Sequence, residues 1–380
     1  MASPSLKHAS MCLLFAATLL SAGTITATGV PVELLRVPQG GIQPQAAIDG
    51  YGTIHLVYFR GEPSGGNLFY ATRGAREQHW SDPIRVNSEA GSGRRNGAIS
   101  HAQLALGANR RVHVSWFNMR PPKYFYTRSR EDAPGFEKQR NLVTDNVDGV
   151  ETGASVAADG SGSVAIVWHA GSIAAEDARG VFARVSRDHG LTFGPESRID
   201  DDRGVCACCG LSAVFSRDGG LYALYRAATA LVHRDITLLK STDHGKSFSA
   251  DKIHEWNIGA CPVSTTRITA GPGNGVLMAW ETKGQVFVSR AGTDEVLQIV
   301  AAPGEQRHRR KNPLAVMNPS GATLLVWGDG PGWRSGGALS WQVFDADWKA
   351  THIAGSAEEM PEYSVPEALA RPDGSFVVIY

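Results

Sequence analysis

The residues in this sequence whose type and spacing most clearly suggest chemistry are four cysteines. Cys206, Cys208 and Cys209 form a C-x-C-C segment, and Cys261 follows further along the chain. Thiolates are soft ligands that select ions such as Cu(I) or Zn(II), although this spacing is shorter than the usual C-x₂₋₄-C of zinc motifs. In an oxidising compartment four cysteines form two disulfides, with three pairings to choose from. The sequence therefore predicts two disulfides, with a copper or zinc site and a redox-active role as the alternatives.

Arginine, histidine and carboxylate side chains stand at the ends of strand-like segments and form a second candidate set. Arg226 follows the segment LYALY, and Arg234 and Asp235 stand in the next loop, so we predict these three as catalytic residues. Residues in comparable positions elsewhere are predicted to bind a ligand: His101, Glu151, His169, Glu281 and Arg310. Charged side chains are mostly exposed, so any one of these residues taken singly is typical of a solvated loop. The prediction depends on elements that bring them together.

A repeated strand pattern supplies those elements. A strand-like segment ending in an aromatic residue recurs at intervals of 47 to 58 residues, at Tyr58, Trp116, Trp168, Tyr225, Trp280, Trp327 and Tyr380. Each follows an alternating run and a Gly or Asp turn, which is typical of a β-hairpin. A third strand follows six of these hairpins, and a short fourth strand completes the unit. Four antiparallel strands repeated radially predict an all-β propeller.

The number of blades depends on how the ring closes. The seventh hairpin is the extreme C-terminus, and an unmatched outer-strand segment, VELLRV, occupies residues 32–37. One blade built from both ends would close the ring and protect its edge strands. We therefore predict a single domain, residues 29–380, with seven blades, the last of which lacks one strand. Six blades is the alternative.

Blade topology predicts where a site would form. Loops before innermost strands and loops after second strands share one rim of a propeller. The Cys206–Cys209 segment precedes the fourth innermost strand, and Cys261 precedes the fifth, so all four cysteines should cluster. The catalytic and ligand-binding candidates should converge on the same mouth.

Two short turns between third and fourth strands share the pattern S-x-D-x-G-x-[ST]-[FW], which is the Asp box. Ser and Asp side chains can bond local amides there, while Gly tolerates a positive φ. Their spacing is in step with the blade repeat, so we predict a structural role for their residues: Ser186, Asp188, Gly190, Phe193, Ser241, Asp243, Gly245 and Phe248.

These Asp boxes resemble those of the sialidase-like (BNR repeat) propeller superfamily. The segments VCACCG, HRDI and GACPV further resemble an exported bacterial group in it whose activity is unassigned. The resemblance implies a ligand site on the rim away from the Asp boxes. The alternative that it implies is an exo-α-sialidase or related glycoside hydrolase, with an arginine triad, a Tyr nucleophile and an Asp acid/base. The matches to that machinery are incomplete: Arg36 lies in a superficially similar L-R-V-P segment, and Tyr363 beside Glu362 is the only nucleophile candidate.

Composition and the first residues bear on location and partners. The chain has 37 basic and 37 acidic residues, without the basic excess that nucleic-acid binders usually show. Residues 1–28 combine a basic start, an apolar run containing Cys12 and small residues, which predicts a signal peptide. No later segment is apolar enough to cross a membrane. We expect a secreted or periplasmic monomer whose partner is a small molecule, a glycan or a metal.

Overall fold

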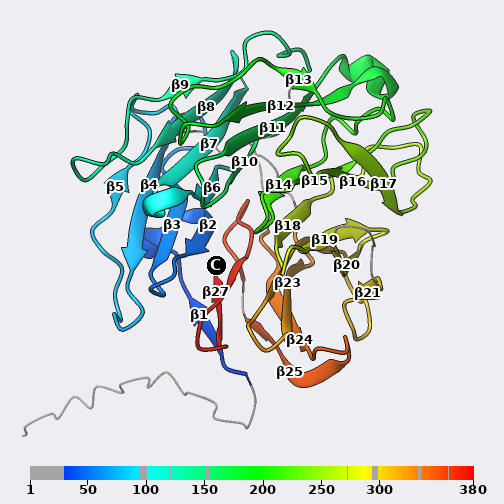
Figure 1. Cartoon of the computed structure of the whole chain (residues 1–380). Helices are drawn as coiled ribbons and strands as arrows, with labels where there is room; N and C mark the ends of the chain where they lie inside the picture. Colours follow the sequence, from blue (N-terminus) through cyan, green and yellow to red (C-terminus); the bar gives the residue numbers. More distant parts are fainter. Residues whose placement is uncertain are drawn as a thin grey trace, which may run out of the picture.

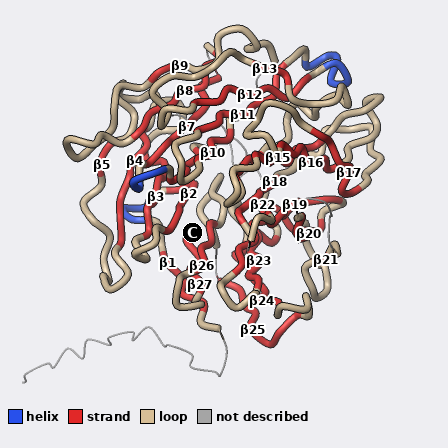
Figure 2. Tube along the Cα trace, viewed as in Figure 1, coloured by secondary structure: helices blue, strands red, loops and turns tan. Residues whose placement is uncertain are grey.

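The computed structural model describes residues 30–93, 101–119, 121–149, 152, 154–271, 273–292, 298–332, 335–357 and 359–380. These residues form seven β-sheets arranged around a common centre (Figure 1). Nearly all regular structure in this part of the chain is strand, and three short 3₁₀ helices complete it (Figure 2). The predicted signal peptide, residues 1–28, lies outside the described residues.

Six blades are four-stranded antiparallel sheets whose strands follow chain order from the centre outward. The first blade contains β2 (Ile42–Ile48), β3 (Ile54–Arg60), β4 (Asn67–Arg73) and β5 (Ile84–Arg85). The second contains β6 (Gln103–Leu106), β7 (Val112–Met119), β8 (Pro122–Arg128) and β9 (Arg140–Asn141). The third contains β10 (Ser155–Ala158), β11 (Val164–Ala170), β12 (Gly180–Ser186) and β13 (Ser197–Arg198). The fourth blade contains β14 (Ser212–Phe215), β15 (Leu221–Arg226), β16 (Ile236–Ser241) and β17 (Ser249–His254). The fifth contains β18 (Thr266–Ala270), β19 (Val276–Thr282), β20 (Gln285–Ala291) and β21 (Val300–Ala301). The sixth contains β22 (Arg310–Met317), β23 (Thr323–Asp329), β24 (Ala338–Phe344) and β25 (Ala350–Ala357). The 3₁₀ helices are η1 (Pro38–Gly40), η2 (Ala108–Arg110) and η3 (Ile173–Ala178).

The seventh blade confirms the predicted closure by both ends of the chain. It contains β26 (Glu367–Ala370), β27 (Phe376–Ile379) and β1 (Val32–Leu35). Figure 1 shows the blue β1 beside the red β27. β1 pairs with β27 in parallel, unlike the antiparallel neighbours within the other blades. A fourth strand runs parallel to the second, so the parallel pairing follows from omission of the third strand.

Burial explains why the second strand of each blade is so apolar. Every residue of β11, β15 and β19 is buried, whereas residues of the outermost β25 alternate between exposed and half-buried. Neighbouring blades cover both faces of a second strand, so its sequence reads as a continuous apolar run. An outer strand is covered less and keeps an alternating pattern.

The hydrophobic core lies in the seams between blades. Seven clusters of buried residues each combine side chains from two neighbouring blades. The cluster containing Val37, Tyr58 and Ile379 joins the seventh blade to the first. Among the described residues, every buried cluster spans two blades, so each blade depends on its neighbours for stability.

Strand register determines which loops share a rim. Ser212, at the start of β14, pairs with Leu224 near the end of β15, and Arg226 pairs with Ile236. The segment before β14 and the loop after Arg226 therefore lie at one rim. Leu221 pairs with Ser241, which places the turn after β16 at the opposite rim. Among the described residues, no helix is long and apolar enough to span a membrane.

Candidate functional site

The four cysteines meet at the rim opposite the Ser/Asp/Gly turns, as the repeat predicted. Their Sγ atoms all lie within 4.8 Å of one another, although Cys261 belongs to a different blade from Cys206, Cys208 and Cys209. The sulfurs pair at disulfide distance as Cys206–Cys209 and Cys208–Cys261. The structure therefore brings together the donor set that the sequence predicted, and it selects one of the three pairings.

A backbone turn makes this crowding feasible. The N–H of Cys206 donates to the carbonyl of Arg226 at 3.0 Å, which attaches the segment to the end of β15. The N–H of Cys209 donates to the carbonyl of Cys206 at 3.3 Å and closes the turn. The N–H of Gly210 donates to the carbonyl of Ser264 at 2.9 Å, which joins the turn to the next blade. The cysteines are therefore held by two blades at once.

Exposure divides the cluster into an inner and an outer disulfide. Cys206 and Cys209 are 0% and 2% exposed, whereas Cys208 is half-buried and Cys261 is exposed. Between the two disulfides, the Sγ atoms of Cys206 and Cys208 are 3.7 Å apart. One sulfur of the outer disulfide thus contacts one sulfur of the inner disulfide.

Arg226, predicted as a catalytic residue, is enclosed by the protein and does not face a ligand site. It is 0% exposed, and its guanidinium lies over the ring of Trp256. It donates to protein acceptors: Ser264 Oγ at 2.6 Å, Thr282 Oγ1 at 3.3 Å and the backbone carbonyls of Arg234 and Glu281. Burial lowers the pKa of Arg226 to about 10. The Arg226 side chain therefore links segments of the rim to one another, and its hydrogen bonds are made to the protein and not to a ligand.

Arg234 and Asp235, the other catalytic candidates, both support loops. Arg234 Nη2 donates to Glu176 Oε2 at 2.6 Å, and Glu176 Oε1 accepts the N–H of Ala207 at 2.7 Å. Arg234 is therefore connected through Glu176 to the cysteine turn. Its Nε and Nη1 are buried and have no hydrogen-bond partner among the described residues. Asp235 accepts the N–H of Trp256 at 2.9 Å.

His169, predicted to bind a ligand, lies directly behind the cysteine turn. Its Nε2 is 3.1 Å from the carbonyl oxygen of Cys209 and 2.7 Å from Thr152 Oγ1, and its Nδ1 is 2.8 Å from Arg179 Nη2. Burial, together with the nearby Arg179 charge, lowers the pKa of His169 to about 3. The imidazole is therefore neutral at physiological pH and holds the turn rather than a ligand.

Glu281 and Arg310 lie on the neighbouring blades. Glu281 is 0% exposed, and its oxygens are 3.5 Å from Arg309 Nη2 and 3.7 Å from Lys311 Nζ. Burial raises the pKa of Glu281, although both cations oppose the rise. Arg310 is also buried and donates mainly to carbonyl oxygens, those of Ala302, Gly304 and Glu305. Arg310 thereby holds the chain before β22, a structural task that the sequence prediction of ligand binding missed.

His101 takes part in a network that crosses the centre of the ring. Arg267 Nη2 donates to Glu367 Oε2 at 2.9 Å, and Gln45 Nε2 donates to the same oxygen at 3.0 Å. Arg267 Nη1 lies 3.5 Å from His101 Nε2. These residues come from four blades, and such blades can meet only across the centre. Burial raises the pKa of Glu367, while Arg267 opposes the rise.

Arg267 and Glu367 were not predicted from the sequence. A charged residue at the start of an innermost strand was the available signal, because that position faces the centre of a propeller. Glu151, the remaining ligand-binding candidate, lies outside the described residues.

The Ser/Asp/Gly turns form the local hydrogen bonds that their residue types allow. Ser186 Oγ accepts the N–H of Gly190 at 2.9 Å, and Asp188 Oδ1 accepts the N–H of Thr192 at 2.9 Å. Gly190 has a φ of +75°, a conformation that favours glycine. Although burial raises it, hydrogen bonds led by Thr192 lower the pKa of Asp188 to about 2. The second turn is built alike, with Gly245 donating to Ser241 and Ser247 donating to Asp243.

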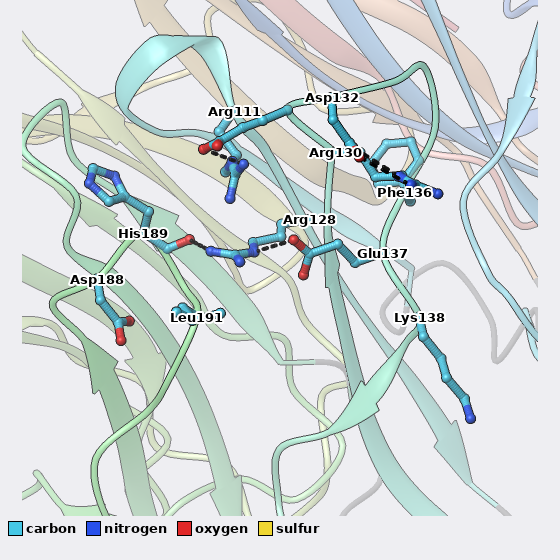
Figure 3. Close-up of a pocket in the computed structure, with 11 residues that line it drawn as sticks. Arg111, Arg128, Arg130, Asp132, Phe136, Glu137, Lys138, Asp188, His189 and Leu191 are labelled. Atoms are coloured by element: carbon cyan, nitrogen blue, oxygen red, sulfur yellow. Dashed lines mark hydrogen bonds and ion pairs between the residues drawn. The ribbon is translucent and has the colours of Figure 1, made fainter.

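A pocket of about 690 Å³ lies on this opposite rim, between the second and third blades (Figure 3). His189 and Leu191 line it from the third blade. Its arginines are engaged with acids of the second blade: Arg111 with Glu131, Arg128 with Glu137 and Arg130 with Asp132. Arg128 also donates to the carbonyl of His189 at 2.7 Å. The pocket is therefore a salt-bridged seam on the rim away from the predicted site.

Comparisons with known proteins bear on the fold. No protein-family model matches the sequence, and no match was found among curated proteins. The BP39L lectin from Burkholderia pseudomallei has a TM-score of 0.64 and 12% identity, over 89% of this chain and 95% of the lectin. The GH93 α-L-arabinofuranosidase of Fusarium graminearum, in complex with arabinobiose, has a TM-score of 0.51 and 11% identity, over 87% of this chain and 98% of the enzyme. The NanB sialidase from Streptococcus pneumoniae has a TM-score of 0.47 and 10% identity, over 76% of this chain and 65% of the sialidase.

At these identities the comparisons show a shared propeller fold. One fold hosts many activities, so any function must come from the residues at the site.

Proposed function

We propose that this chain is an exported β-propeller that binds one soft metal ion, Cu(I) or Zn(II), through four cysteine thiolates at the rim opposite its Ser/Asp/Gly turns. The observation that carries the proposal is the convergence of the four Sγ atoms within 4.8 Å from two blades. Zinc–thiolate bonds of about 2.3 Å in a tetrahedral centre put the sulfurs about 3.8 Å apart. The Cys206 and Cys208 sulfurs already have a separation of 3.7 Å.

The surroundings suit a negatively charged centre. Four thiolates around Zn(II) or Cu(I) leave a net negative charge, which is costly to bury without compensating cations. Ser264 Oγ donates to Cys209 Sγ at 3.5 Å and itself accepts from buried Arg226. Arg234 adds a second buried guanidinium, which is paired with Glu176 and linked to the cysteine turn through that carboxylate. A hydroxyl donor thus contacts Cys209 Sγ, and the positive charge of Arg226 acts on it through Ser264.

The metal-binding form requires all four cysteines to be reduced. The sulfurs pair as two disulfides in this structure, and exported proteins encounter an oxidising compartment that favours this state. The same side chains therefore have an oxidised form with two disulfides and a reduced form with four metal ligands. A metal titration must begin with the reduced protein.

The test is a metal titration of residues 30–380, reduced and kept under anaerobic conditions. We expect one Zn(II) or Cu(I) per chain, measured by elemental analysis after gel filtration, and no binding by the oxidised protein. Cys206→Ser and Cys261→Ser should each abolish tight binding, because a missing thiolate opens the donor set. Asp243→Ala, on the opposite rim, is the matched control and should bind one ion. Failure of the reduced protein to bind either ion would reject the proposal.

The arginines of this chain do not favour glycoside hydrolysis, the alternative suggested by the sequence resemblance. Arg226 and Arg310 already donate to protein acceptors, and Arg36 lies over the ring of Tyr380 at the strand that closes the ring. The triad of ligand-directed arginines that a sialic acid carboxylate needs therefore lacks these members. A fluorogenic sialoside assay tests the alternative, and turnover abolished by Arg226→Ala would support it.

A further inference from the structure

We infer that the four cysteines also form a thiol–disulfide relay, in which Cys208 passes reduction from the outer disulfide to the inner one. This activity does not depend on a bound metal. The outer disulfide, Cys208–Cys261, includes an exposed sulfur, whereas both residues of the inner disulfide, Cys206–Cys209, are buried. A reducing agent from solution therefore has access to the outer disulfide first.

Contact between the disulfides makes the transfer feasible. Cys206 Sγ and Cys208 Sγ are 3.7 Å apart, which is van der Waals contact for two sulfurs. The C-x-C spacing and the turn closed by the Cys209 N–H hold these two sulfurs side by side. Disulfide exchange proceeds by attack of a thiolate on a disulfide sulfur. Once Cys208 is released as a thiolate, the disulfide sulfur of Cys206 lies beside it.

The first step consumes an external dithiol, because one dithiol molecule supplies both thiols that the reduction of one disulfide requires. One thiolate of the dithiol attacks Cys261 Sγ, breaks the Cys208–Cys261 bond and releases Cys208 as a thiolate. The second thiol of the reagent then attacks the mixed disulfide, releases Cys261 and leaves the reagent as a disulfide. Two electrons pass to the cysteines, and the two thiol protons of the reagent become available to the released thiolates.

The second step is an internal exchange with no net redox change. The Cys208 thiolate attacks Cys206 Sγ, forms a Cys206–Cys208 disulfide and releases Cys209 as a thiolate. This exchange moves the remaining disulfide to Cys208, which is more exposed than Cys209. A second dithiol then reduces the Cys206–Cys208 bond in the same way, so four thiols form and two reagent molecules are oxidised.

The structure stabilises the leaving group of the exchange. Ser264 Oγ donates to Cys209 Sγ at 3.5 Å, and Arg226 Nε donates to Ser264 Oγ at 2.6 Å. A hydrogen bond from a hydroxyl that is polarised by a guanidinium favours the charged sulfur. A stabilised thiolate leaves faster in disulfide exchange. Arg226 and Ser264 are therefore positioning residues for this exchange, a role that was not predicted from the sequence.

The decisive experiment compares two variants that both lack the outer disulfide. Cys261→Ser leaves Cys208 as a free thiol beside Cys206, whereas Cys208→Ser leaves Cys261 free. Each protein is treated with dithiothreitol, quenched by alkylation at intervals and mapped by mass spectrometry. We expect the inner disulfide to be reduced at least about tenfold more slowly in Cys208→Ser than in Cys261→Ser, because the latter keeps the Cys208 thiol that lies 3.7 Å from Cys206 Sγ. In the unsubstituted protein, Cys261 should be alkylated first.

Equal rates in the two variants would overturn the relay, as would a different native pairing in the map of the oxidised protein. Thermal unfolding of both variants checks that each is folded before the rates are compared. Ser264→Ala should slow the loss of the inner disulfide about threefold to tenfold, and Ser264→Thr should restore it, because only the hydroxyl matters. Metal binding has its own readout, so a protein that relays electrons but binds no ion would reject only the metal proposal.

Discussion

Several buried basic side chains in this protein donate to backbone carbonyls and hydroxyls. Arg226 and Arg310 hold loop segments in this way, and His169 holds the cysteine turn. A buried donor left without a partner costs about 1–3 kcal/mol, so these bonds matter for stability. Residue type alone does not distinguish an arginine that binds a carboxylate ligand from one that binds three carbonyls, because both are polar residues beside a predicted mouth.

His113 should make the stability of the protein depend on pH. Its imidazole is 1% exposed and lies 2.8 Å from Tyr126 Oη. Burial, together with Arg111 and Arg128, lowers the pKa of His113 to about 3. A histidine in the unfolded chain has a pKa of about 6.5, so below that pH the unfolded state takes up a proton that the folded state does not. Stability is therefore lost as the pH falls from about 6.5 towards 3.

We expect His113→Gln to flatten this loss. The free energy of unfolding, from urea denaturation at pH 4 to 7, should fall more steeply for the unsubstituted protein. The two slopes should differ by up to about 1.4 kcal/mol per pH unit in this range, the contribution of one proton. Parallel curves for the two proteins would show that His113 does not stay neutral in the folded state.

Individual strands and turns decide which side chains can meet. In β15 every side chain is buried, so Arg226 at its end enters the seam between blades and not the solvent. The segment before β14 and the segment before β18 stand at equivalent points of adjacent blades, which brings Cys261 beside Cys208. The same register puts the Ser/Asp/Gly turns at the other rim, where they connect third and fourth strands.

The Ser/Asp/Gly turn of the third blade should contribute measurably to stability through Asp188. Asp188→Ala removes acceptors for the backbone N–H and hydroxyl of Thr192. We expect a loss of about 1–2 kcal/mol in the free energy of unfolding by urea. Metal stoichiometry should not change, because the turn lies on the rim away from the cysteines. Exposed Asp251 in β17 is the matched control, and Asp251→Ala should cost less than about 0.5 kcal/mol. Equal stability of the two variants would contradict the assigned role.

Closure by both ends organises the molecule as a whole. Val37 N–H donates to the carbonyl of Tyr380 at 3.2 Å, and Tyr380 N–H donates to the carbonyl of Leu35 at 3.0 Å. β1 thereby covers the outer edge of β27, which no other strand of the blade covers. Each seam cluster is shared by two blades, so loss at this closure affects the first and sixth blades as well.

Deletion of residues 30–35 tests the closure. We expect the midpoint of thermal unfolding to fall by about 5–10 °C, because a packed strand is lost and the ring loses its last contacts. The uncovered edge of β27 should promote self-association, visible by sedimentation velocity. Arg36→Ala, just beyond β1, leaves the strand in place and should change the midpoint little. A deletion variant with the stability and the sedimentation profile of the unsubstituted protein would show that β1 is dispensable.

The candidate site could be predicted only in part. The blade period placed Cys206–Cys209 and Cys261 at equivalent points, so their clustering followed from counting repeats. The pairing Cys208–Cys261, the contact between Cys206 and Cys208 and the bond from Ser264 to Cys209 did not follow. Those depend on turn geometry and on side-chain rotamers within a few ångströms, which residue spacing does not specify.

By itself the sequence determined the propeller, its seven blades and the blade completed from both ends. It could do so because strand periodicity and the spacing of aromatic residues are local properties, repeated often enough to be counted. Only the tertiary structure decided that β1 runs parallel to β27, that Arg226 is committed to the protein, and that Arg267 reaches Glu367 across the ring. Those contacts join segments far apart in the chain, and their energies depend on burial and distance, which exist only once the ring has formed.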